Sequence, residues 1–186
     1  MRFNLIFKFT RNVNFDKTHF FVLQLNDTTT LFLGGTDALQ RILSYDWNTE
    51  TYTEHPELWI KKHIYNSCAV LKDEDGNPLV VTSGSFFDQA DVQYSGLEAW
   101  SPVHGTTSIL SEFHPDEEGA LFPLRSSQMI SINDGSELLM YGGFNGNGLQ
   151  SIWKFTLVDN TWAKTGSLPA PKFGHEVLPV WGIECP

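Results

Sequence analysis

The stretch LLMYGGFNGNGLQSIWKFTLVDNTW, residues 138–162, contains the pattern that decides the fold. Its apolar run ends at the pair Gly142–Gly143, a glycine-rich segment follows, and a second run leads through Asp159–Asn160 to Trp162. Short apolar runs bounded by Gly, Asp and Asn are typical of antiparallel strands joined by tight turns. The stretch therefore predicts antiparallel sheet, and its recurrence elsewhere would indicate a repeat protein.

The pattern recurs twice. TTTLFLGG ends at Gly34–Gly35 and NPLVVTSG ends at Ser83–Gly84. The second glycines stand at 35, 84 and 143, so the separations are 84 − 35 = 49 and 143 − 84 = 59 residues. A period of about 50 residues is the length of a propeller blade of four short strands.

Each glycine position also lies at the end of a predicted hairpin. Lys17, Asn66 and Arg125 stand 17 residues before the first position of each pair (34 − 17, 83 − 17, 142 − 17), and each opens a strand. The strand leads into the glycine run through LNDTTT, KDEDGNP or NDGSE. These turns are rich in Asp, Asn and Gly, which tolerate left-handed backbone.

A second hairpin is predicted after the glycines. Tyr45 and Tyr52 are seven residues apart (52 − 45 = 7), and Phe155 and Trp162 are also seven apart (162 − 155 = 7). Polar turn residues lie between the members of each pair. Two hairpins per unit imply four strands per unit. Large aromatic side chains on the outer strands would fill the space between neighbouring sheets.

The middle unit departs from this pattern. Trp100 occupies the inner aromatic position, but Thr107 stands seven residues later (107 − 100 = 7). Only Ile109 or Leu110 can supply the outer hydrophobic side chain. We therefore expect the outermost strand of this unit to be shifted or frayed.

The pattern resembles the kelch repeat, in which an apolar run ends in Gly-Gly, a Tyr-Asp pair follows, and an aromatic residue stands seven residues later. The segments YDWNTETYTEHPEL (45–58) and PAPKFGHEV (169–177) are similar to the inter-hairpin turn and the repeat-opening segment of that family. The resemblance covers about residues 17–177 and departs from the family at Ser83 and at the missing outer Trp of the middle unit. It implies an all-β, kelch-type β-propeller that is incomplete, with three four-stranded antiparallel blades plus the first strand of a fourth.

The expected organisation follows from this resemblance. An N-terminal strand or extension covers 1–16, blade 1 covers 17–58, the degenerate blade 2 covers 59–122, blade 3 covers 123–171, and the first strand of a truncated blade 4 covers 172–186. The residues expected to carry the structural repeat motif are Gly34, Gly35, Tyr45, Tyr52, Gly84, Trp100, Gly142, Gly143, Phe155 and Trp162.

Three blades do not close a propeller, which typically needs four to eight. Three interpretations stay open. The chain is a piece of a longer propeller, or half of a homodimer in which two three-blade halves form a six-blade ring, or an open arc with apolar faces at both ends. A strand expected at residues 3–9 would supply an outer strand to a blade completed elsewhere.

Composition excludes several partners. Twelve Lys and Arg stand against 22 Asp and Glu, for a formal net charge of −10, which repels phosphate backbones and anionic lipids. No apolar stretch approaches the roughly 18 residues that cross a bilayer. We expect no nucleic acid and no membrane as partner. The compartment stays open: cytoplasmic is slightly favoured, and the extracellular alternative stands if a signal peptide is missing from this sequence.

The sequence contains no recognisable set of metal ligands or catalytic residues. Its six histidines, at positions 19, 55, 63, 104, 114 and 175, show no HxH, HxxxH or HExxH spacing, and Cys68 and Cys185 have no CxxC partner. DEDGN (73–77) fits a tight hairpin better than a calcium loop, and GGFNGNG (142–148) precedes no helix and is expected to be a mobile surface loop. We expect no cofactor, no metal and no enzymatic activity.

The kelch resemblance implies a non-catalytic module that binds a protein partner through loops on one face. These loops join the second and third strands of each unit, at 36–41, 84–96 and 144–150. The side chains expected to bind are Phe86, Phe87, Asp88, Asp91, Tyr94, Asn145 and Asn147. Apolar anchors beside carboxylates suit a basic, hydrophobic peptide. The alternatives are a galactose-oxidase-like or sugar-isomerising propeller enzyme, for which no copper-ligand set is found, and a fragment without independent function.

Overall fold

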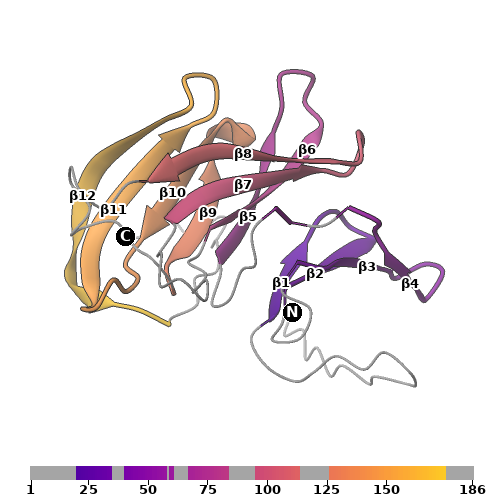
Figure 1. Cartoon of the computed structure of the whole chain (residues 1–186), viewed down its shortest axis with the longest axis horizontal. Helices are drawn as coiled ribbons and strands as arrows, with labels where there is room; N and C mark the ends of the chain where they lie inside the picture. Colours follow the sequence, from indigo (N-terminus) through magenta and orange to yellow (C-terminus); the bar gives the residue numbers. More distant parts are fainter. Residues whose placement is uncertain are drawn as a thin grey trace, which may run out of the picture.

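A computed structural model describes residues 20–34, 40–57, 59–60, 67–83, 95–113 and 126–174. Within these ranges the chain is all-β, with twelve strands and one short 3-10 helix (Figure 1). No helix in these ranges has the length and apolar character that crossing a membrane requires.

The strands form three four-stranded antiparallel sheets, each with its strands in sequence order (Figure 1). Sheet 1 consists of β1 (Phe20–Gln24), β2 (Thr29–Gly34), β3 (Ile42–Asp46) and β4 (Thr51–Glu54). Sheet 2 consists of β5 (Ser67–Lys72), β6 (Pro78–Ser83), β7 (Ser95–Ser101) and β8 (Thr106–Phe113). Sheet 3 consists of β9 (Gln128–Ile132), β10 (Glu137–Tyr141), β11 (Leu149–Thr156) and β12 (Thr161–Lys172), and the 3-10 helix η2 (Asn133–Gly135) forms the turn between β9 and β10.

The seven-residue aromatic spacing is the register of the outer hairpins. Tyr45 lies opposite Tyr52 across β3 and β4, and Phe155 lies opposite Trp162 across β11 and β12. Directly opposed side chains on antiparallel strands are close enough to pack, and the ring centroids of the two pairs are 4.6 Å and 5.0 Å apart. The two hairpins expected in each unit are therefore present.

The repeat spacing derived from the glycine pairs is wrong by one residue. Thr30, Val80 and Leu138 each lie opposite the inner aromatic residue of the outer hairpin in their own sheet. Equivalent positions are therefore 80 − 30 = 50 and 138 − 80 = 58 residues apart, instead of 49 and 59. By this register Gly34 is equivalent to Gly142, the first glycine of its pair. Gly34 is the last residue of β2, and Gly142 directly follows β10.

The outermost strand of the middle sheet is complete, which corrects the expected fraying. β8 pairs with β7 from Ser101↔Thr106 to Ser95↔Phe113, with one irregularity in which Leu97 lies opposite Ser111 and Glu98 opposite Ile109. Leu110 is therefore the extra residue of a β-bulge, and it packs against the core between sheets 2 and 3. Backbone pairing holds this strand without an outer aromatic residue. Of the two expected alternatives, the strand is shifted in register and not frayed.

The residue expected to open a fourth unit belongs to sheet 3. Lys172 is the last residue of β12 and lies opposite Leu149 of β11. The rest of the strand expected at 172–186 falls mainly outside the described residues, as does the strand expected at 3–9.

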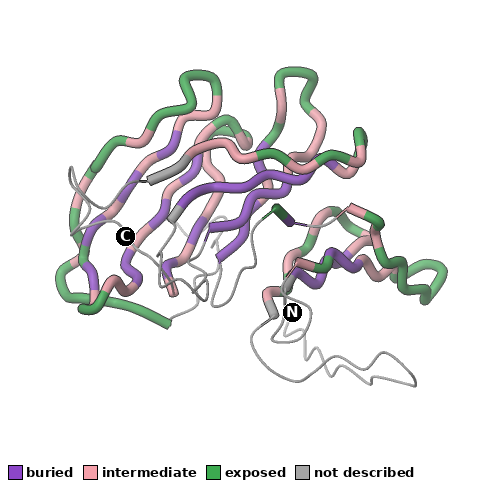
Figure 2. Tube along the Cα trace, in the orientation of Figure 1, coloured by how far each residue is buried: buried purple, intermediate pink, exposed green. Residues whose placement is uncertain are grey.

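The middle sheet is buried on both faces (Figure 2). Successive residues of a strand point to opposite faces, so neighbours such as Val80 and Val81 enter different cores. The core shared with sheet 1 contains Leu31, Leu33, Ile42, Trp59, Cys68, Val80 and Trp100. The core shared with sheet 3 contains Ala69, Leu71, Val81, Leu97, Ala99, Met129, Leu138, Met140, Trp153 and Phe155.

Neighbouring sheets approach most closely at their first strands. β5 contacts both β1 and β9. Farther out, large side chains fill the gap between the sheets: the indole Nε1 of Trp162 on β12 donates a hydrogen bond to Ser111 Oγ on β8 at 2.9 Å. The sheets therefore diverge from their first strands towards their last, as stacked blades do.

Burial of both faces of sheet 2 predicts that adjacent residues of β6 are equally sensitive to truncation. Val80→Ala and Val81→Ala should each lower the free energy of unfolding by about 2 kcal/mol, because each removes buried methyl groups from a different core. Val158→Ala, at a turn position 81% exposed, should change it by less than about 0.5 kcal/mol. Chemical denaturation measures all three, and a neutral result for either core valine would contradict two-sided burial.

Candidate functional site

The candidate site consists of the loops that join the second and third strands of each sheet. Of these, the β10–β11 loop is described throughout, and the β2–β3 loop is described from Gln40 onward. Phe86, Phe87, Asp88, Asp91 and Tyr94 lie outside the described residues, as do Gly35 and Gly84 of the repeat motif.

The base of the β10–β11 loop is held by backbone hydrogen bonds. Gly142 N–H donates to Ser151 O at 3.0 Å, Gly143 N–H donates to Lys172 O at 2.7 Å, and Leu149 N–H donates to Gly143 O at 2.9 Å. Gly142 has φ 64° and Gly143 has φ 100°, values that favour glycine. The positive φ angles explain why both positions are glycine. The hydrogen bonds fix the base of the loop, for which the sequence predicted mobility.

The tip of this loop is a compact turn that rests on the end of β12. Phe144 and Gly148 form an isolated bridge, and Asn145 N–H donates to Asn147 O at 3.2 Å. The ring of Phe144 packs edge-on against Phe173, with centroids 5.5 Å apart. Of the two predicted binding residues here, Asn147 is exposed and Asn145 is half-buried.

The tip adds an apolar residue to the candidate site. Phe173 is 58% exposed, and its ring lies 3.1 Å from where a Cβ on Gly148 would stand. Sequence reasoning did not select Phe173, because it follows the last strand of the unit and reaches the loop only through the pairing of β11 with β12.

The β2–β3 loop is tied to the segment that connects sheets 1 and 2. Gln40 Nε2 donates to Trp59 O at 2.7 Å, and Trp59 N–H donates back to Gln40 O at 3.0 Å. The next residue, Ile60, donates its N–H to Glu98 Oε2 at 2.9 Å. Glu98 is 0% exposed, so a buried carboxylate on β7 positions this connection.

Glu98 was missed by the sequence reasoning. Its signal is an acidic residue on an apolar strand, SGLEAWS, at a position that alternates with Leu97 and Ala99. Buried carboxylates are rare unless they accept hydrogen bonds, which makes such a position a candidate for a structural clamp.

His55 packs on the inner aromatic of the middle sheet. Its ring lies 4.7 Å from that of Trp100, and its Nε2 is 3.0 Å from Ser44 Oγ. Burial lowers the pKa of His55, and the charge of Glu57 opposes this shift. The described residues contain no group of three or more His, Cys, Asp or Glu side chains that could hold a metal ion.

The glycine pair gives one test of the loop geometry. Gly143→Ala should lower the free energy of unfolding by about 1–3 kcal/mol, because φ 100° is strained for a residue with a side chain. Gly166→Ala is the control: its added Cβ would meet Ile152 Cδ1 at an ordinary 3.7 Å, and alanine in a strand should be neutral or stabilising by up to about 1 kcal/mol. Equal effects in denaturation curves would contradict the assigned backbone.

His55 gives a pH test. The folded state lowers its pKa below the reference value of 6.5, so the neutral ring favours folding. The stabilisation of the folded state by the neutral His55 ring is complete above about pH 6.5. It is lost as the pH falls through that value towards the lower folded-state pKa. The loss of stability between about pH 8 and about pH 5 should be smaller in His55→Gln than in the wild type. Identical losses in pH-dependent denaturation would contradict the burial of His55.

Comparisons with known proteins bear on the fold alone. No family model matches the chain, and no curated protein matches it. The chain is similar to a solved structure, that of YjhT, with a TM-score of 0.60 and 10% sequence identity. The similarity covers 83% of this chain and 53% of that one, so the chain spans about half the length of the YjhT structure.

Proposed function

We propose that the chain is a non-catalytic binding module of kelch propeller type, which holds a protein partner through the loops between the second and third strands. The observation that carries this proposal is the repeated sheet. Three sheets of identical strand order stack through their faces, and each presents its loop at the same end of the second strand. We expect such stacking to gather the loops on one side of the molecule.

The scaffold supports recognition because it fixes the loops at their ends. Gly142, Gly143 and Leu149 hold one loop through backbone hydrogen bonds, and Gln40 holds the end of another through Trp59. A loop fixed in this way loses less conformational entropy on binding.

The chemistry of the loops favours a basic, hydrophobic peptide as the partner. Phe86, Phe87, Phe144 and Phe173 offer apolar anchors, of which Phe173 is exposed. Asp88 and Asp91 add negative charge to a chain whose net charge is already −10. Aromatic anchors supply much of the affinity of protein interfaces, and complementary charge speeds association.

The proposal predicts that partner capture depends on the loops and not on the opposite turns. A triple variant, Phe86→Ala, Phe87→Ala and Asp91→Asn, should weaken every directly bound partner at least tenfold, since aromatic hot spots commonly contribute about 2 kcal/mol or more each. The matched control is Val103→Ala, Val158→Ala and Asp159→Asn, in turns at the other ends of the strands. Quantitative pull-down, followed by titration of each captured protein, gives the comparison; partners that bind the loop variant as before would overturn the proposal.

A further inference from the structure

The third sheet has a far face, turned away from sheet 2, that carries an apolar patch. Met129, Leu138, Met140 and Trp153 pack towards sheet 2, so the residues that alternate with them point the other way. The apolar patch on this far face of sheet 3 consists of Ile130, Ile132, Leu139, Tyr141 and Ile152, all of them half-buried. By register the face also carries the polar residues Gln128, Glu137, Lys154 and Thr156.

The same face of the other two sheets is fully covered within the chain. By strand register, Leu139 is equivalent to Leu31 of sheet 1 and Val81 of sheet 2. Each lies opposite a residue of the first strand in its own sheet, namely Ile130, Leu23 and Ala69 respectively. Ile152 is likewise equivalent to Ile42 and Leu97. All four equivalents in sheets 1 and 2 are 0% exposed, because the next sheet packs on them.

The far face of sheet 1, turned away from sheet 2, is equivalent to the faces of sheets 2 and 3 that pack on the preceding sheet. Tyr45 is equivalent by register to Trp100 and Phe155, whose side chains enter the core shared with the preceding sheet. Its ring lies 4.6 Å from that of Tyr52 and 4.8 Å from that of Trp47. Trp47 and Tyr52 are 41% and 38% exposed, and Val22 on the same face is 41% exposed.

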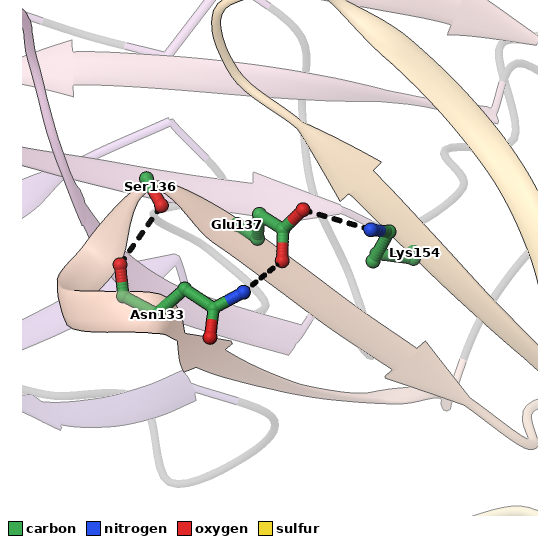
Figure 3. Close-up of polar contacts among 4 residues, drawn as sticks. All are labelled: Asn133, Ser136, Glu137 and Lys154. Carbon is green, nitrogen blue, oxygen red and sulfur yellow. Dashed lines mark hydrogen bonds and ion pairs between the residues drawn. The ribbon is translucent and has the colours of Figure 1, made fainter.

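Each of these two faces carries an ion pair. On sheet 3, Glu137 Oε1 lies 2.8 Å from Lys154 Nζ, and its other carboxylate oxygen accepts a hydrogen bond from Asn133 (Figure 3). On sheet 1, Arg41 lies 3.3 Å from Glu54. Neither face therefore carries an isolated charge from these groups that docking would have to bury.

We propose that a second copy of this chain docks its sheet 1 far face onto the sheet 3 far face, head to tail. The contact continues the series of interfaces between sheets 1 and 2 and between sheets 2 and 3. Two copies supply two such contacts and six sheets, within the four to eight that close a ring. The proposal rests on the sheet stacking that underlies the proposed function, but it uses the end faces in place of the loops.

The first test is the mass of the full chain in solution. Sedimentation velocity over a concentration series should give a dimer of 2 × 21.0 = 42.0 kDa. The dimer should tighten as salt rises, because screening weakens the repulsion between two chains of net charge −10. A monomer at every concentration and salt level would overturn the proposal.

Complementing variants test the head-to-tail geometry. Leu139→Lys with Ile152→Lys disables the sheet 3 face, and Trp47→Lys with Tyr52→Lys disables the sheet 1 face. Each double variant should be monomeric alone, because both contacts of its homodimer would include a disabled face. An equimolar mixture should form a heterodimer, since the intact sheet 1 face of one variant meets the intact sheet 3 face of the other in one of the two contacts. Dimerisation of the sheet 1 variant alone would show a two-fold contact between sheet 3 faces and would contradict the proposal.

Two controls keep the test interpretable. Each variant must retain the wild-type circular dichroism spectrum and a cooperative melt, and milder Leu139→Ala with Ile152→Ala replaces a lysine variant that does not fold. Val158→Lys, at an 81% exposed turn, should leave the dimer intact. The loop variant Phe86→Ala, Phe87→Ala, Asp91→Asn should also dimerise, so that failure of partner capture and failure of assembly are distinguishable.

Discussion

The burial of sheet 2 on both faces is the constraint on which the rest of the structure depends. A four-stranded sheet that is apolar on both sides cannot fold in water without two neighbours. In β5, β6 and β7 consecutive residues such as Val80 and Val81 enter separate cores, and Trp100 and Ala99 do the same. Sheets 1 and 3 supply the two covers, and this joins the three sheets into one stacked series.

Stacking also explains where the large side chains lie. The first strands approach closely and the last strands diverge, so bulky residues are needed only farther out. Phe155 and Trp162 fill the space between sheets 2 and 3, where the Trp162 indole also bonds Ser111. Between sheets 1 and 2 the outer partner of Trp100 is the small Thr107, and His55 from the connecting segment packs on Trp100 instead.

The sequence predicted the features that depend on residues close together in the chain, such as turns, hairpin register and glycine backbone conformation. The spacing of Phe155 and Trp162 is a cross-strand register, and Gly142 and Gly143 adopt positive φ. It failed where the answer depends on tertiary contacts. The Ile60–Glu98 bond and the His55–Trp100 contact join residues about 40 positions apart in the chain, and the continuation of β12 to Lys172 depends on its partner strand. For the candidate site, the sequence identified the loops, and only the fold shows that Phe173 adjoins Phe144.

Amide hydrogen exchange tests the central claim most directly, since exchange reports the free energy of opening for each strand. If sheet 2 is held from both sides, the amides of β6 should exchange only through global unfolding and should be the slowest in the chain. The outermost strand β4, whose residues are all exposed, should exchange through local opening at much lower free energy. Exchange of β6 at the rate of β4 would contradict two-sided burial, and with it the stacked arrangement.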